Sequence, residues 1–390
     1  LLPCVECDVD YEEEAKIWID KVIKLIPTQA EIHSKHIKPK SSINELINKN
    51  NPLTVKVLEN LRLTSEKRRN AIHHIELALE NNQIFSISPG DSVGVIARNP
   101  SELVNTILNL VNLTGNESVN LKMGTLSLRE ALSDHCDLNV ISSKLLENWS
   151  TLSKDNELHL LLQGDNKSIR TFTRQNYLSE LLTHYPAQIE PQTFVDLLRP
   201  LQPRLYDLAN STKYINDEAH ILVERYIYQH ASREYFGIAS NYLVGLSEED
   251  VVSIFPHPNK RFHLPINQTV PLILIADGTG IAPFRAFIQE VSIDNKRQHP
   301  IWLFFQERYF KEDFLYQAEW LKFIETENLT RLDIAFYKDN SELKLFDLVK
   351  QNYSQFKGWL TSGAHIYLSG HKSELELFES LLNAGIACFG

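Results

Sequence analysis

Hydrophobic and polar positions change their spacing twice between residues 53 and 270. They alternate in LTVKVLENLRLT and NAIHHIELAL, which is typical of half-buried strands, and Pro89-Gly90-Asp91 predicts a turn into SVGVIA. Between about 99 and 198, apolar residues recur every three or four positions in SELVNTILNLVNL, LSLREALSDHC, QNYLSELLTHY and PQTFVDLLR, which predicts helices. Alternation returns in AHILVERYIY and VVSIF. The pattern predicts an antiparallel β-barrel with a helical insertion at about 99–198.

A parallel α/β domain is predicted from 271 to 390. Short apolar strands (LILIA, IWLFF, LTRLDIAF and HIYLSG) alternate with helical runs (PFRAFIQEV, FLYQAEWLKFIE, LFDLVKQNY and ELELFESLL), which is typical of a parallel sheet with crossover helices. Ligands on such sheets bind at the carboxyl ends of the strands. A Gly-Thr-Gly turn at 278–280 follows the first strand, so we expect a ligand there. The predicted fold class is therefore α/β plus β-barrel.

The first 52 residues predict a terminal helix and a tether. Residues 1–27 carry an apolar stripe that includes Trp18, Ile19 and Val22 at helical spacing, and we expect the element against which this stripe packs to lie outside the chain. Residues 28–52 are polar and contain Pro39, which is typical of a linker. The predicted order is this remnant, the linker, a barrel domain at 53–270 and the α/β domain at 271–390.

Composition narrows the function classes. The chain has 390 residues, 43% of them hydrophobic, and a formal net charge of -11, which argues against nucleic acid or an anionic membrane as the main partner. No apolar run approaches the ~20 residues that cross a bilayer, and no basic leader opens the chain, so we expect a cytoplasmic protein. Cys4 and Cys7 form the one close cysteine pair, which is either two reduced thiols, a redox dithiol or half a zinc site.

Three short stretches carry candidate chemistry. In PRLYDLANS, Arg204 and Tyr206 lie two apart on one face of a strand, where an arginine fork can hold a diphosphate and a phenol ring can cover a planar ligand. In YFGIASNYL, Gly237 and Ser240 either bind a phosphate at a helix start or simply cap that helix. The Gly-Thr-Gly turn offers a phosphate cradle, but Asp277 places a negative charge directly before it.

The order of these stretches resembles the diflavin reductases. The remnant, linker, barrel, helical insertion, RLYDLANS, GIASNYL, GTGIAPFRAF, LFFQERYFKEDFLYQAEW and GAHIYLSG follow one another as in that family, and are most similar to the flavoprotein alpha subunits of NADPH-dependent sulfite reductase. The resemblance covers the whole chain and implies an FAD-binding barrel followed by an NADP-binding domain. It also implies a preceding FMN-binding flavodoxin-like domain, of which residues 1–27 would be the last strand and helix.

The resemblance implies a set of cofactor-binding residues. The expected FAD contacts are Thr125, Arg204, Leu205, Tyr206, Asp207, Val223, Tyr228, Gly237, Ile238, Ala239 and Ser240, and the expected NADPH contacts are Gly278, Thr279, Gly280, Tyr337, Lys338 and Lys344. Asp207 and Ser369 are the expected catalytic positions. The family has serine at the position of Asp207, near flavin N5, and a carboxylate there would disfavour an anionic reduced flavin by like-charge repulsion.

Several positions depart from the family on the nicotinamide side. The family's Gly-Pro before the Gly-Thr-Gly turn is Ala276-Asp277 here, its glycine after Leu-Phe-Phe is Gln306, and its Cys-Gly-Asp is the Ser-Gly-His run at 369–371. We expect Asp277 and its companions to oppose a phosphate-bearing ligand and to weaken NADPH binding.

The expected clamp for the 2′-phosphate of NADPH also departs from the family. The family's Ser-Arg pair is Tyr337-Lys338, and its Lys-x-Tyr-x-Gln run reads LKLFD at 343–347. Only Lys338 and Lys344 remain as cations, and lysine lacks the planar fork of arginine.

Two function classes remain open from the sequence. The first is an oxidoreductase in which FAD accepts hydride from NADPH and passes electrons through FMN to the sirohaem and iron–sulfur beta subunit of sulfite reductase. The second is a diverged, NADPH-impaired flavoprotein subunit with a structural or regulatory role. The family continues beyond the last helix to an aromatic C-terminus, whereas this chain ends at IACFG, which indicates either a fragment or a shortened protein. The sequence does not predict the oligomeric state, and no metal is expected.

Overall fold

A computed structural model describes residues 47–79, 85–230, 233–293, 300–339, 343–372 and 375–376 of the chain. The predicted terminal remnant at 1–27, most of the predicted linker and the Cys4–Cys7 pair lie outside these residues. The chain forms two compact units, which we describe separately. The helical unit is Arg98–Gln202, and the two-sheet unit contains the described residues before Arg98 and after Gln202.

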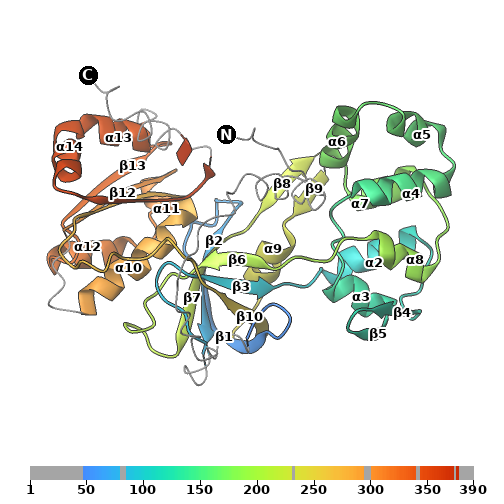
Figure 1. Ribbon diagram of the computed structural model, residues 1–390, viewed down its shortest axis with the longest axis horizontal. Helices are drawn as coiled ribbons and strands as arrows, with labels where there is room; N and C mark the ends of the chain where they lie inside the picture. The colour runs from blue at the N-terminus through green and yellow to red at the C-terminus, as the bar shows by residue number, and fades with distance from the viewer. Residues whose placement is uncertain are drawn as a thin grey trace, which may run out of the picture. The chain divides into compact units, whose positions relative to one another are not determined.

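An antiparallel sheet forms the first half of the two-sheet unit (Figure 1). Its order is β6-β3-β10-β1-β2-β7, and a bridge between Leu208 and Ile221 joins the two ends of the sheet into a barrel. The inward side chains of the strands, such as Val57, Ile75 and Val93, are fully buried in one core, which explains the alternation in the sequence. The strands are β1 (Leu53–Arg62), β2 (Ile72–Ala78), β3 (Ser92–Ile96), β6 (Arg204–Asp207), β7 (Glu218–Glu224) and β10 (Val251–His257).

Shorter elements flank the barrel. Strands β8 (Ile227–His230) and β9 (Arg233–Phe236) form a hairpin, and α9 (Ile238–Val244) follows it. The predicted Pro-Gly-Asp turn precedes β3, and Gly90 has φ +98, a left-handed conformation that glycine adopts without strain. A side chain at this position would also meet the carbonyl oxygen of Phe262.

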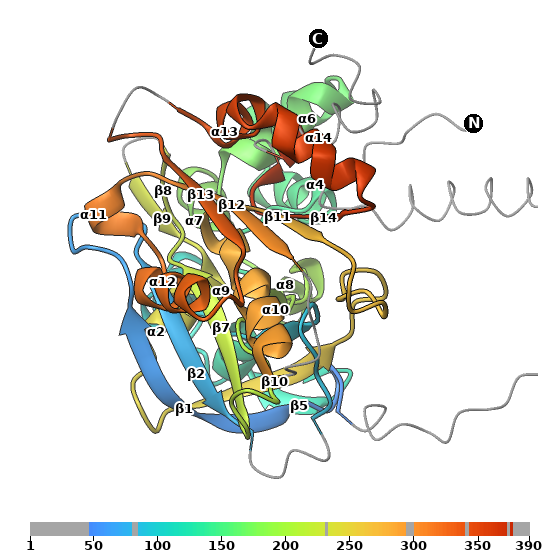
Figure 2. The same ribbon diagram turned by 90° about the vertical axis from the view of Figure 1, so that its left-hand side faces the viewer.

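A parallel four-stranded sheet, ordered β13-β12-β11-β14, forms the second half of the two-sheet unit. Alternate residues of β11 face opposite cores: Leu272 and Leu274 pack with α10 and α12, whereas Ile273 and Ile275 pack with α13 and α14. Figure 2 shows these helix pairs on the two faces of the sheet. The elements are β11 (Leu272–Asp277), η2 (Gly278–Ile281), α10 (Ala282–Ile293), β12 (Ile301–Glu307), α11 (Phe310–Asp313), α12 (Gln317–Glu325), β13 (Arg331–Phe336), α13 (Leu345–Gln351), α14 (Tyr353–Thr361) and β14 (His365–Ser369).

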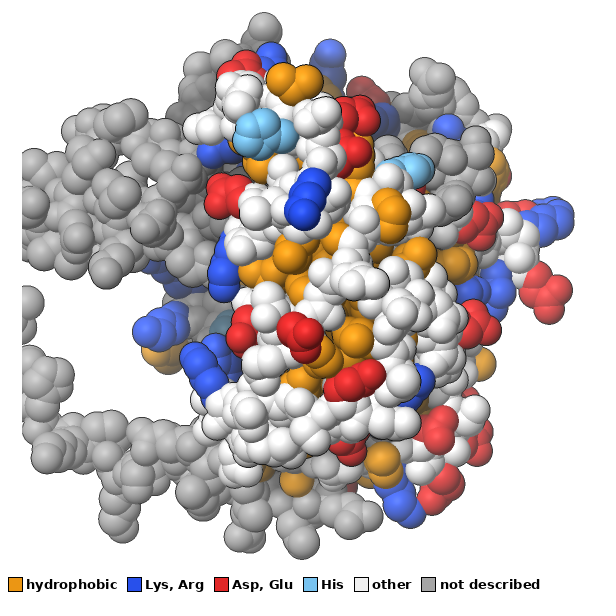
Figure 3. All heavy atoms as spheres, turned by 90° about the vertical axis from the view of Figure 1, so that its right-hand side faces the viewer, with side chains coloured by type: hydrophobic (Ala, Val, Ile, Leu, Met, Phe, Trp, Pro, Cys, Tyr) orange, Lys and Arg blue, Asp and Glu red, His pale blue; other side chains and the backbone are white. Residues whose placement is uncertain are grey.

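The helical unit packs around Trp149 and Phe194, whose rings lie 6.4 Å apart in its core. The four helices expected from the sequence are present, together with three more helices and a β-hairpin. Figure 3 shows hydrophobic side chains gathered on one face, and the exposed ones of this unit include Leu152 and Leu160. The elements are α2 (Ser101–Leu110), β4 (Ser118–Leu121), β5 (Gly124–Ser127), α3 (Leu128–Asp134), α4 (Ser143–Ser153), α5 (Asn156–Leu162), α6 (Asn166–Gln175), α7 (Leu178–His184) and α8 (Pro191–Leu197).

The predicted fold class is confirmed: an antiparallel barrel sheet with a helical insertion is followed by a parallel sheet covered by helices. The predicted last helix, ELELFESLL, falls largely outside the described residues. Across the described ranges, no helix is long and apolar enough to span a membrane.

Candidate functional site

Strand β6 presents Arg204 and Tyr206 on the same face, as expected from their spacing. The strand pairs with β3, where Arg204 lies opposite Val95 and Tyr206 opposite Val93. Burial raises the pKa of Tyr206 to about 12 against the opposing effect of Arg204, so the phenol is neutral at physiological pH. The Arg204 side chain is exposed and makes no hydrogen bond or ion pair within the part of the chain that the structure describes. Its planar set of donors is therefore available to a diphosphate.

Asp207, an expected catalytic residue, lies at the end of β6 and opposite Ser92 of β3. The Ser92 hydroxyl donates a hydrogen bond of 2.9 Å to the Asp207 carboxylate. Loss of surrounding water raises the pKa of this carboxyl, and the hydrogen bond from Ser92 only partly opposes the rise. Asp207 therefore holds a proton more readily than an ordinary aspartate.

The start of α9 contains the expected phosphate-binding residues Gly237, Ile238, Ala239 and Ser240. The Ser240 hydroxyl accepts the backbone N–H of Tyr226 at 3.0 Å and donates to the Gly237 carbonyl at 3.3 Å. This hydroxyl therefore joins the helix to the segment after β7, and no side chain of the described residues caps the start of α9, so the capping alternative considered from the sequence is not borne out. The backbone N–H groups of residues 238–240 lie in the first helical turn, where no acceptor exists inside the helix, and they remain the donors this segment can offer.

The remaining expected flavin contacts lie in different surroundings. Leu205 is 49% exposed on β6, and Tyr228 stacks on Tyr235 with ring centroids 5.8 Å apart. Val223 is fully buried in the barrel core, so its side chain packs on other apolar side chains. Thr125 belongs to the helical unit, where its hydroxyl donates to Asn120 at 2.6 Å. Contact of these residues with a flavin stays a prediction.

The Gly-Thr-Gly turn forms the short helix η2 at the carboxyl end of β11, where the sequence placed it. Gly278 has φ +55, and a side chain there would have room. A Cβ on Gly280 would lie 2.1 Å from the backbone oxygen of Ser369, so this position must be glycine for the turn to pack against the end of β14. Ser369, the second expected catalytic residue, lies buried at that contact.

The Asp277 side chain is buried, and its carboxylate contacts two polar side chains. The amide of Gln306 donates to it at 2.9 Å, and the imidazole Nδ1 of His371 lies 2.7 Å from its other oxygen. Burial favours a higher pKa for Asp277, but the hydrogen bonds from His371 and Gln306 outweigh it and lower the pKa. The hydrogen bond that His371 donates to Asp277 raises the pKa of His371 against the effect of burial. A protonated His371 therefore neutralises the charge that the sequence left uncompensated.

A cleft of about 540 Å³ opens beside Asp277, and we call it the β11 cleft. It brings together Gly278, Tyr337 and Lys344 of the expected NADPH set with Tyr226, which follows β7 in the barrel. The other lining residues are Arg68, Arg69, Asn70, Glu224, Asp277, Gln306, Glu307, Arg308 and His371. The cleft therefore lies where the barrel meets the carboxyl edge of the parallel sheet.

The backbone of Tyr337 and Lys338 follows β12 beyond the end of β13. The Tyr337 N–H donates to the carbonyl of Glu307 at 3.0 Å, and the Lys338 N–H donates to that of Arg308 at 2.8 Å. The Lys338 ammonium lies 5.9 Å from the centre of the Tyr337 ring. A second cleft, of about 680 Å³, is lined by residues of α11 and β13 that include Phe310 and Phe336. Whether either cleft receives the 2′-phosphate stays a prediction.

Sequence reasoning missed Arg68, which joins the barrel to the parallel sheet. Its Nη1 donates to both carboxylate oxygens of Glu307 at 3.0 and 2.9 Å, and the guanidinium also reaches Glu224 and Asp313. Burial raises the pKa of Glu307 to about 7, although Arg68 acts in the opposite direction. Glu307 lies 239 residues from Arg68 in the chain, so no local pattern could have paired them.

The residues of this region fit the two expected cofactors to different degrees. For FAD, Arg204 offers a diphosphate fork and Tyr206 a planar surface, and Tyr226 and Phe236 are exposed aromatic side chains of the same half. For a nicotinamide dinucleotide, the η2 turn and the cations Arg308 and Lys344 fit, whereas the Asp277–His371 pair is electrically suitable only when His371 is protonated.

Comparison with known protein families shows to which family the chain belongs. The model of the family described as FAD binding domain matches residues 46–242, which is half of the chain. The chain belongs to this FAD binding domain family. The model described as oxidoreductase NAD-binding domain matches residues 274–376, which contain most of β11, the turn η2 and the strands β12, β13 and β14. The expected FAD-binding and NAD-binding domains are thereby confirmed in this family member.

Relatives with assigned names are similar along the whole chain. A protein named sulfite reductase [NADPH] flavoprotein alpha-component, from Buchnera aphidicola subsp. Acyrthosiphon pisum, is 33% identical over 386 residues, covering 96% of this chain and 63% of the relative. Proteins of the same name are 34% identical in Klebsiella pneumoniae, over 96% of this chain and 63% of the relative, and in Shigella flexneri, over 100% and 66%. The chain thus spans slightly less than two thirds of these relatives. The expected resemblance is confirmed.

Proposed function

We propose that this chain is the FAD- and NADPH-binding part of a sulfite reductase flavoprotein. In this proposal it oxidises NADPH and passes the electrons through an FMN domain to a sirohaem and iron–sulfur subunit. The observation that carries the proposal is the β11 cleft, in which Tyr226 from the barrel and Gly278 from the parallel sheet line one space. A donor site in one half and an acceptor site in the other are what transfer between two cofactors needs.

The chain's own residues have separate tasks in this proposal. FAD, when bound, accepts two electrons together from NADPH and releases them singly. Arg204 binds the diphosphate of FAD, and Tyr206 covers its planar ring, because both lie on one face of β6. Asp207 follows Tyr206 at the end of β6, where the Ser92 hydroxyl orients its carboxylate and its raised pKa makes it a better proton acceptor than an ordinary aspartate. Gly278 and Gly280 allow the backbone to approach the diphosphate of NADPH.

A specific observation supports the second function class, a flavoprotein subunit impaired toward NADPH. Asp277 lies in the β11 cleft with its charge compensated only through His371. When His371 is neutral, the pair carries a net negative charge and opposes a phosphate-bearing ligand. This class keeps FAD binding and loses hydride transfer, so the two classes differ in turnover and agree in flavin content.

Electron acceptors distinguish the two classes. We expect the purified 390-residue chain to oxidise NADPH with ferricyanide, which takes electrons from FAD directly, and to reduce cytochrome c more slowly by on the order of tenfold or more, because the matched domains supply one flavin site. Adding a separately produced FMN domain from a relative should raise the cytochrome c rate. Steady-state absorbance assays measure both rates.

The control in these assays is flavin content, determined after denaturing the protein. Cytochrome c reduction as fast as ferricyanide reduction, or stoichiometric FMN in the preparation, would contradict the proposed domain roles. FAD at full occupancy with neither acceptor reduced would favour the impaired class. The sirohaem partner, the FMN domain and a cytoplasmic location stay predictions.

A further inference from the structure

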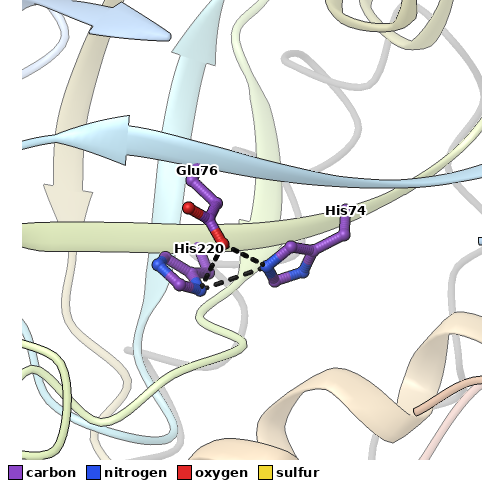
Figure 4. Close-up of side chains that lie close together, drawn as sticks. All are labelled: His74, Glu76 and His220. Carbon is purple, nitrogen blue, oxygen red and sulfur yellow. Dashed lines mark hydrogen bonds and ion pairs between the residues drawn. The ribbon is translucent and has the colours of Figure 1, made fainter. Parts of the chain in front are cut away.

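Two histidines and a glutamate converge on one point on the barrel sheet. His74 and Glu76 lie two residues apart on β2, and the register of the sheet places Glu76 opposite His220 of β7. Figure 4 shows the three side chains pointing toward one another. His74 Nε2 lies 3.2 Å from Glu76 Oε1 and 3.1 Å from His220 Nδ1, and the latter two atoms are 3.7 Å apart.

The outer nitrogen of each imidazole already has a partner. His220 Nε2 lies 2.6 Å from the Glu218 carboxylate, and His74 Nδ1 lies 2.8 Å from the hydroxyl of Tyr316. A neutral imidazole carries one N–H. Because a carboxylate only accepts, that hydrogen lies on Nε2 of His220, and the lone pair of Nδ1 faces the centre of the cluster. A carboxylate behind a histidine is the usual outer arrangement around a metal-binding imidazole.

We propose that His74, Glu76 and His220 bind a divalent transition-metal ion of the zinc class. A circle through three points with the separations above has a radius of about 1.9 Å, so an ion slightly out of their plane meets the ~2.0–2.2 Å bond lengths of zinc to nitrogen and oxygen. Two imidazoles and one carboxylate form a known zinc donor set. The ion would tie β2 to β7.

Burial and charge support an ion at this point. His74 and His220 are 5% and 2% exposed, so water does not compete for their lone pairs, whereas Glu76 is only partly buried and leaves a route for an ion. The carboxylates of Glu76 and Glu218 balance a divalent charge.

Arg285 is the cation that acts on this cluster, and it has its own partners. Its Nε lies 3.0 and 2.9 Å from the two oxygens of Glu319, and its Nη1 donates to the Ala209 carbonyl at 2.8 Å. Its charge is therefore largely compensated. A single proton on His74, shared with Glu76 and His220, is the competing occupant of the centre, and the experiment separates the proton from the metal.

Zinc binding by the full 390-residue chain tests the proposal. The chain is stripped with a chelator, reloaded with Zn²⁺ and desalted, and its metal content is measured by mass spectrometry. All proteins carry Cys4→Ser and Cys7→Ser, because that pair is a competing thiolate site. We expect one zinc per chain and a higher thermal midpoint for the loaded protein. Glu76→Gln keeps the shape and hydrogen bonds but loses the anionic donor, so zinc affinity should fall by more than about tenfold.

The matched control is His73→Gln, next to His74 on the same strand. His73 Nδ1 contacts Asn60 at 2.8 Å instead of the cluster, so this variant should keep the zinc. Absence of zinc in the parent protein, or equal zinc affinity in the parent and Glu76→Gln, would overturn the proposal. If Glu76→Gln does not fold, X-ray absorption of the loaded parent decides: two imidazole nitrogens and one oxygen support the site, and a shell of oxygens alone contradicts it.

Discussion

Replacing Arg204 with alanine is expected to lower the affinity for FAD by about 10- to 150-fold, the equivalent of ~1.5 to 3 kcal/mol for one charge-assisted hydrogen bond. Within the described chain, the Arg204 side chain is exposed on β6 and makes no hydrogen bond or ion pair, so its removal breaks no polar contact that holds the fold. The effect should therefore appear in flavin binding and not in stability. Fluorescence titration of the flavin-free protein with FAD measures it.

The control for Arg204 is Arg261→Ala, which removes an exposed arginine from the segment after β10. This variant should bind FAD as the parent does. Arg204→Lys should lie between the parent and Arg204→Ala, because lysine keeps the charge and loses the planar fork. Equal FAD affinity in the parent and Arg204→Ala would remove the basis for placing the diphosphate at β6.

Replacing Asp277 with asparagine is expected to tighten NADPH binding at pH values above the raised pKa of His371, where the imidazole is neutral. The pKa of His371 is raised by its hydrogen bond to Asp277, so the pair is neutral below that raised pKa and negative above it. A carboxylate ~5 Å from a phosphate opposes binding by about 3 kcal/mol at an effective dielectric near 20, before screening. Salt and the nearby cations reduce this, and we expect a gain of roughly 3- to 30-fold.

The sign of the pH dependence is a further check on Asp277. In the parent protein, NADPH affinity should fall as pH rises through the pKa of His371, and the gain from Asp277→Asn should shrink where His371 is protonated. Glu325→Gln, an exposed change at the end of α12, controls for net charge. Proline, the family's residue, is less suitable, because Asp277 has φ -123, far from the angle that proline requires. Calorimetry measures these affinities. An NADPH affinity that changes neither with pH in the parent protein nor on replacement of Asp277 by asparagine would contradict the proposed effect of the Asp277 charge.

The fold was predictable from the sequence where apolar residues alternate regularly or form an unbroken run. Strands β11 and β12 are buried throughout, and their apolar runs are visible in the sequence. Helices α4, α5 and α6 were missed. The stripe of α4, with Leu145, Leu146 and Trp149, was present in the sequence and was overlooked, whereas α5 buries only Leu158 and α6 buries no residue. Their start signals were present: Asp155 and Asp165 accept backbone N–H groups of the first turns.

The positions of the main site residues were predictable from the sequence, whereas the ion pairs that compensate their charges were not. Arg204, Tyr206 and the Gly-Thr-Gly turn carry local patterns, and the structure places the turn at the carboxyl end of β11 as expected. The charge of Asp277 was taken as uncompensated because His371 lies 94 residues away. Ion pairs between distant segments depend on how the sheets meet, which no local pattern specifies.

The absorption spectrum of the purified chain before and after anaerobic addition of NADPH tests the central claim most directly. The account predicts a bound oxidised flavin, identified as FAD after release, whose visible absorbance bleaches when NADPH is added. Dithionite provides the fully reduced reference. Folded protein without flavin, or FAD that stays yellow in excess NADPH and bleaches with dithionite, would contradict the claim that this chain oxidises NADPH.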